Sequence, residues 1–227
     1  MNDIKKELQI AIDTTLKGVL NEAYVLEPKK FNLQTEALSE ATKKARQKEF
    51  ESYVSTLNRV SAELEGADRE AANAFSSDFR SLKCDESFNM NAAFLRALHF
   101  ENISDLNSNL SMDTLTYIKL VRDFGTFDEW QRDFIACGMS SRDGYAVTGY
   151  SIFLKRYINC VIDTESLNVT VGLLPIIVLD VAEGAYYRDY LDNRKKYILN
   201  MMKQFNWDRV EERIQRAEKV AKVFQNA

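Results

Sequence analysis

Glycine and proline are scarce in this chain, which has 227 residues but only 8 glycines and 2 prolines. Glycine supplies the left-handed backbone of tight turns, and turn-rich all-β folds need both residues often. The scarcity therefore favours long helices. Hydrophobic residues make up 45% of the chain, which is enough to bury a core and excludes global disorder.

Apolar residues at helical spacing predict a long helix over residues 35–64, capped by Thr35 and ended by Gly66. We expect its buried face to consist of Leu38, Ala41, Ala45, Glu49, Tyr53, Leu57, Val60 and Leu64, with Glu49 as the one charge. Further helical patterns cover 3–23, 68–80, 88–100, 112–123 and 127–137.

The pattern changes near residue 147. Residues 147–161 and 173–181 are rich in β-branched and aromatic side chains and predict strands, after which the chain becomes helical to its end. Helices followed by strands and again by helices indicate an α+β fold with two lobes. The longest apolar run, 173–179, is too short to span a membrane.

Charge and histidine content exclude several kinds of site. The chain carries 30 basic and 34 acidic residues and a net charge of −4, which argues against a dedicated nucleic-acid binder. His99 is the single histidine, so neither a histidine-based triad nor a multi-histidine metal site can form. The three cysteines are widely spaced, which indicates a reducing compartment.

Five collinear stretches resemble the iron/manganese superoxide dismutase family. DVAEGAYY (180–187) follows an apolar strand where the family has D-V-W-E-H-A-Y-Y. The other stretches are YVSTLN (53–58), NAAFLRALHF (91–100), FGTFDEWQRDF (124–134) and TGYSIFLKR (148–156). The resemblance covers about 27–214. It implies an N-terminal helical hairpin lobe and a C-terminal α/β lobe with a small antiparallel sheet.

The resemblance also implies a division of the chain into three parts. Residues 1–26 would be an extra amphipathic helix, 27–108 a helical N-terminal domain and 109–227 an α+β C-terminal domain.

The expected metal site departs from the family, which holds one iron or manganese with three histidines and one aspartate. The resemblance places these four positions at Ala45, Leu98, Asp180 and Gly184, so one ligand of four is kept. His99 lies one residue, about 100° around a helix, beyond Leu98, and we expect it to face elsewhere. The resemblance thus implies an inactive relative with no catalytic residues, no metal and no cofactor.

Residues around that site are partly changed and partly kept. By resemblance, the gateway histidine is Glu49 and a glycine-flanked tryptophan is Tyr150, whereas Tyr53, Glu183 and Tyr187 match the family. In relatives the glutamate at the position of Glu183 crosses the dimer interface to a ligand histidine of the other subunit. Because Gly184 removes that histidine here, we expect a heterodimer with a second dismutase-like chain.

Metal-free proteins of this fold are known as structural subunits of mitochondrial ribosomes, so the resemblance implies a structural component of the small ribosomal subunit. We expect the protein to be a ribonucleoprotein component in mitochondria, or otherwise in the cytoplasm. Its partners would be proteins, with at most a peripheral contact to rRNA, and it would bind neither a membrane nor a small-molecule substrate. Residues 1–20 have the composition of neither a secretory signal nor a transit peptide. Two alternatives stay open: a redox enzyme with an altered metal site at Glu49, Asp180 and Glu183, or an inactive partner subunit of an active dismutase.

Overall fold

The computed structural model describes residues 24–225. The helix predicted over 3–23 lies outside these residues. No helix within the described range has the length and apolarity that crossing a membrane requires.

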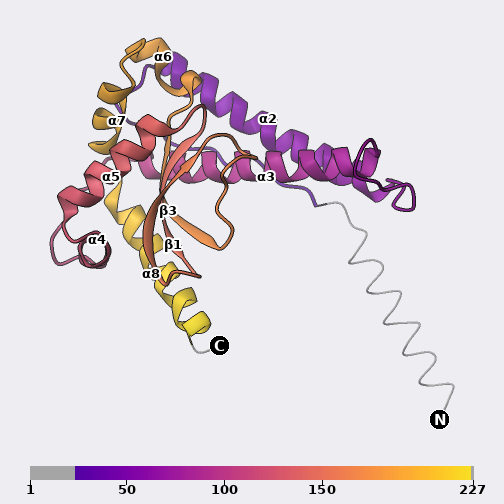
Figure 1. Cartoon of the computed structure of the whole chain (residues 1–227). Coiled ribbons are helices and arrows are strands. Elements are labelled where there is room, and N and C mark those ends of the chain that lie inside the picture. Colours follow the sequence, from indigo (N-terminus) through magenta and orange to yellow (C-terminus); the bar gives the residue numbers. More distant parts are fainter. Residues whose placement is uncertain (1–23, 226–227) are drawn as a thin grey trace.

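Two long helices, α2 (Glu40–Glu65) and α3 (Asp78–Ile103), lie side by side in opposite directions and form the N-terminal helical pair (Figure 1). Ser39 caps α2, and its Oγ accepts a hydrogen bond from Thr42 N at 3.3 Å. The predicted start at Thr35 is wrong because the Thr35 hydroxyl instead accepts from Ala37 N and forms a local turn. Gly66 caps the other end of α2, as predicted.

A single helix, α3, replaces the two predicted over 68–80 and 88–100. The connection before it is held by side chains that bond their own backbone. Asp68 Oδ1 accepts from the N–H groups of the second and third residues beyond it, and Asn73 Oδ1 does the same. These turns compete with helix, so the helical backbone begins only after Ser77.

The sheet has three antiparallel strands in the order β2-β1-β3, with β1 (Tyr145–Ser151), β2 (Arg156–Ile162) and β3 (Leu173–Asp180). The predicted strand 147–161 is in fact a hairpin, which turns through Lys155 at a φ of 56°. In the β1–β3 register, Tyr145 lies opposite Asp180 and Val147 opposite Val178.

The two faces of the sheet pack against different helices. Tyr145, Val147 and Val178 share one hydrophobic cluster with Leu95 of α3. Alternating residues, such as Ala146, Ile177 and Leu179, face the larger core. Figure 1 shows the sheet between α3 and the C-terminal helices.

The larger core is formed by α4 (Leu115–Phe124), α5 (Phe127–Ser140), α6 (Glu183–Tyr190), α7 (Arg194–Met202) and α8 (Trp207–Gln225). Trp130 is fully buried in it and donates from Nε1 to Thr148 Oγ1 at 2.9 Å. The helical run predicted after residue 180 is divided into α6, α7 and α8, because Leu191 takes a φ of 53° and Asn193 caps a new helix. The predicted α+β class, with a helical pair and a three-stranded antiparallel sheet, is confirmed.

Candidate functional site

Asp180, the last residue of β3, is the point where four elements meet. Its side chain lies on the same face of the sheet as that of Val178, two residues earlier, and therefore points toward α3. The sheet register brings Tyr145 of β1 beside it. The carboxylate is completely buried, so an unpaired charge there would be very unfavourable.

Two arginines compensate this buried carboxylate. Arg46 of α2 donates from Nη2 to Asp180 Oδ2, and Arg96 Nε of α3 lies 3.3 Å from the same oxygen. Burial opposes ionisation of Asp180, but the two guanidinium groups outweigh it and lower the pKa of Asp180 to about 2. Burial would lower the pKa of both arginines, yet Asp180 raises it. All three groups therefore remain charged at neutral pH.

Glu49 bridges the two guanidinium groups on their outer side. Its Oε2 lies 2.6 Å from Arg46 Nη1 and 3.1 Å from Arg96 Nη1, and its Oε1 accepts from the Tyr53 hydroxyl at 2.9 Å. Glu49 is partly exposed, so it lies at the edge where the cluster meets solvent. We refer to Arg46, Glu49, Arg96 and Asp180 as the charge cluster.

Tyr145 extends the cluster toward the loop after β2. Its hydroxyl accepts from Arg96 Nη2 at 3.2 Å and donates to Glu165 Oε1 at 3.3 Å. Burial is the main cause of the raised pKa of Glu165. Tyr145 thus gives Arg96 a neutral acceptor in a place where water is excluded.

His99 also faces Asp180, which corrects the prediction that it points elsewhere. Its Nδ1 lies 3.3 Å from Val178 O and 3.4 Å from Asp180 N. The reason is helical spacing, since position 99 follows Arg96 by three residues and shares its face of α3. Burial, helped by the two guanidinium groups, lowers the pKa of His99 to about 4, so its ring is neutral at pH 7.

None of the expected ligand positions other than Asp180 is fully buried. Ala41 and Ala45 are exposed on α2, so the predicted buried face is wrong by one residue there, and Thr42 and Arg46 take the inner places. Leu98 is half-buried and packs against the cluster that contains Leu95 and Val178. Gly184 is exposed at the start of α6.

Gly184 and Arg46 are in close contact. A Cβ atom added at Gly184 would lie 2.9 Å from Arg46 Nη1. That nitrogen is fixed by its ion pair with Glu49, and the neighbouring Nη2 by Asp180. The guanidinium of Arg46 therefore uses the space into which a side chain at position 184 would extend.

Of the remaining predicted positions, Glu183 and Tyr187 are exposed and Tyr150 is buried. The Glu183 side chain is exposed, and its backbone N–H donates to Asp143 Oδ1 at 2.9 Å. Tyr187, one helical turn later, is half exposed. Tyr150 lies on the face of the sheet opposite to Asp180, where it contacts Tyr157 in the larger core.

The residues of this site do not fit the metal that the resemblance implies. Among residues 24–225, no three side chains of the histidine, cysteine, aspartate and glutamate types come together as a metal site would require. The donor chemistry gives the reason: the oxygens of Asp180 and Glu49 already accept from protonated guanidinium groups, which repel a cation. The cluster is a set of fixed, mutually compensating charges.

Sequence analysis missed Arg46, Arg96, Tyr145, Glu165 and Tyr197, whose hydroxyl donates to Asp180 O at 2.6 Å. One signal was available in NAAFLRALHF, because Arg96 is a charge on the face of α3 that also carries Ala92 and Ala93. A charge in such a place needs a buried partner.

Comparisons with known proteins agree with this architecture. Residues 114–213 match the family model described as iron/manganese superoxide dismutases, C-terminal domain. The chain is 34% identical over 173 residues to the iron superoxide dismutase of Aquifex pyrophilus, covering 75% of this chain and 80% of that protein. It is 27% identical over 199 residues to the Mn/Fe superoxide dismutase of Aeropyrum pernix, covering 86% and 92%.

Proposed function

This chain belongs to the iron/manganese superoxide dismutase family, and we propose that it is a structural member of that family without dismutase activity. The observation that carries the proposal is the pair of guanidinium groups on Asp180. Asp180 corresponds by resemblance to a metal ligand of the family, and here its charge is balanced by Arg46 and Arg96. The other three corresponding positions, Ala45, Leu98 and Gly184, have no donor atoms in their side chains.

The test is metal analysis of the purified full chain, combined with a superoxide dismutase assay before and after incubation with iron and manganese salts. We expect neither stoichiometric metal nor activity. One bound iron or manganese ion per chain together with dismutase activity would overturn the proposal and support an altered redox site. Co-purification of activity with a separate chain would instead indicate an inactive partner of a working dismutase.

The surface around Glu183 supports a role in binding another protein. The Glu183 carboxylate is exposed and makes no ion pair within the described part of the chain, and Tyr187 exposes half of its surface. A cleft lined by these residues and Asp143 lies at this point. We infer that a second dismutase-like chain, which keeps a histidine able to donate a hydrogen bond to the Glu183 carboxylate, binds here.

Light scattering coupled to size-exclusion chromatography tests this partner. We expect the purified chain alone to elute as a monomer, because a symmetric pair would leave the Glu183 carboxylate without its histidine donor. Addition of the second dismutase-like chain should give a complex that Glu183→Gln weakens and Glu63→Gln, on the exposed end of α2, does not. A stable homodimer of the chain alone would contradict the inference.

The proposed assembly is the small subunit of the mitochondrial ribosome. Its support is the combination of the family fold, the arginine-compensated site and an acidic chain of pI 5.3, which suits a peripheral subunit held by protein contacts. Sedimentation of the tagged protein from a gentle lysate should place it with small ribosomal subunits. Migration as a light species near dimer size would refute the ribosomal role. The proposed loss of dismutase activity is tested separately, by the metal analysis.

A further inference from the structure

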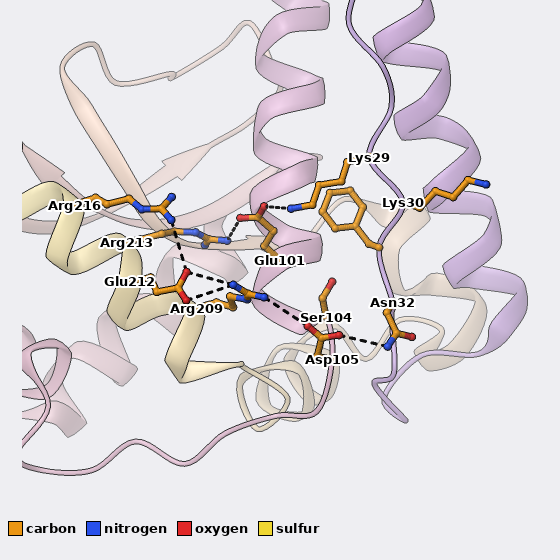
Figure 2. A pocket seen from close by; sticks show the side chains of 11 residues that line it. Lys29, Lys30, Asn32, Glu101, Ser104, Asp105, Arg209, Glu212, Arg213 and Arg216 are labelled. Carbon is orange, nitrogen blue, oxygen red and sulfur yellow. Dashed lines mark hydrogen bonds and ion pairs between the residues drawn. The ribbon is translucent and has the colours of Figure 1, made fainter.

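A charged cleft of about 370 Å³ lies between the segment before α2, the end of α3 and the first half of α8 (Figure 2). Its volume is within the range of small-molecule sites, about 300–1,000 Å³. Five basic and three acidic side chains line it, so its formal charge is two units positive. The chain as a whole is acidic, with a net charge of −4.

Three arginines of α8 supply most of this positive charge. Arg209, Arg213 and Arg216 follow one another at spacings of four and three residues, which places them on one face of the helix. Arg213 is the buried member and donates to Ile176 O at 2.8 Å and Leu98 O at 3.1 Å. It therefore anchors α8 to β3 and α3, and the other two guanidinium groups remain near solvent.

The inner carboxylate of the cleft, Glu101, is shared by two cations. Its oxygens lie 2.7 Å from Lys29 Nζ and 3.0 Å from Arg213 Nη2. Lys30, the next residue along the chain, makes no ion pair among the described residues, and Figure 2 shows its ammonium group turned away from the others. Lys30 is thus a positive charge at the rim of the cleft that no acidic side chain balances.

The outer carboxylate, Glu212, is also shared, and its contacts are longer. It lies 3.3 Å from Arg209 Nη1 and 3.7 Å from Arg216 Nη2, while Asp105 lies 3.9 Å from Arg209 Nη2. Arg216 is 75% exposed. Such loose, exposed pairs contribute little to stability, so the guanidinium groups can turn toward a ligand at small cost.

We propose that this cleft binds a small ligand through a phosphate monoester group. A phosphate monoester carries close to two negative charges at neutral pH, which matches the excess of two positive charges in the lining. Arginine is the residue best suited to it, because the planar guanidinium donates two parallel hydrogen bonds to phosphate oxygens. We infer that Arg209 and Arg216 make these contacts.

Crowding of positive charge in the cleft supports the same conclusion. Burial lowers the pKa of Arg213, and the neighbouring Arg216 and Arg209 lower it further, against the opposing Glu101. A bound anion would relieve this repulsion. The site lies outside the charge cluster around Asp180 and does not depend on whether the chain has dismutase activity.

The test is isothermal titration calorimetry of the full chain with inorganic phosphate and with pyrophosphate, at an ionic strength held constant with sodium chloride. We expect saturable binding at one site, weakened by about tenfold or more in Arg216→Glu. The matched control is Arg132→Glu, because Arg132 is 74% exposed and pairs with a glutamate of its own helix, as Arg216 does. Both variants change the net charge equally, so a loss confined to Arg216→Glu reports the cleft.

Three results would overturn the proposal. The first is the absence of saturable binding to the wild-type chain, and the second is equal weakening in both variants. The third is equal binding of two single-stranded RNAs, one with a 5′-phosphate and one without a terminal phosphate, together with weaker binding of both by Arg216→Glu. The RNA without a terminal phosphate carries phosphodiesters alone, so this result would show that the cleft recognises a nucleic-acid backbone and not a monoester.

Discussion

The buried imidazole of His99 predicts how the stability of this protein depends on pH. The ring is packed against Asp180 N and Val178 O, and its pKa in the folded chain is lowered from 6.5 to about 4. Between these values the unfolded chain binds a proton that the folded chain excludes. Stability therefore falls as the pH falls through this window and is unaffected by His99 above it.

The expected size follows from the two pKa values. At ~1.4 kcal/mol per pH unit, the interval from 6.5 to about 4 corresponds to a total loss of about 3 kcal/mol, of which about 2 kcal/mol should appear by pH 5. A loss of this size is a large fraction of the roughly 5–15 kcal/mol that stabilises a typical domain.

Urea denaturation at several values between about pH 7.5 and pH 5 measures this dependence. The control is His99→Asn, which keeps a polar atom near the position of Nδ1 and cannot titrate; its slope in this window should be flatter by the amount due to His99. Because the chain has one histidine, NMR of the imidazole gives the same pKa independently. A midpoint near 6.5 by NMR, or equal slopes for both proteins, would refute the reasoning.

Three further predictions follow from contacts within the fold. Asp180→Asn should destabilise the protein by about 3–5 kcal/mol, because it leaves buried guanidinium groups uncompensated. In urea denaturation, adding Arg46→Met to Asp180→Asn should cost less stability than Arg46→Met costs in the wild-type chain. Gly184→Ala should lower the free energy of unfolding by about 1–3 kcal/mol, since the added Cβ meets Arg46 Nη1. In an Arg46→Ala background the same substitution should have no such effect, and full tolerance of Gly184→Ala in the wild-type background would contradict the prediction. Thr148→Val should lower the unfolding free energy by about 1–3 kcal/mol because it leaves the Trp130 N–H without an acceptor, whereas an unchanged denaturation midpoint would show that another group accepts it.

Much of the fold was predictable from local patterns. Gly66 marks the end of α2, and the apolar segment that ends in Asp180 is a strand. The hairpin turn between β1 and β2 was not predictable, because three of its four residues, 152–154, are apolar: Phe153 lies at the turn and is 89% exposed. A hydrophobic run without turn residues gives no sign that the chain reverses within it.

The candidate site was predictable only at Asp180, Glu49 and Tyr53. Apolar spacing placed Ala45 on the buried face of the helix, and not the neighbouring Arg46. Its burial depends on a carboxylate 134 residues later in the chain, and no local pattern contains that information. For the same reason, His99 was assigned away from the site by counting from Leu98, although its spacing from Arg96 places it inside.

The separation between Arg46 and Asp180 also has a consequence in time. A ribosome adds about 5–20 residues per second, so the 134 residues between them take roughly 7–27 s to synthesise. For that interval the guanidinium group of Arg46 lacks its buried partner. We therefore expect α2 and α3 to reach their native packing only after Asp180 has left the exit tunnel.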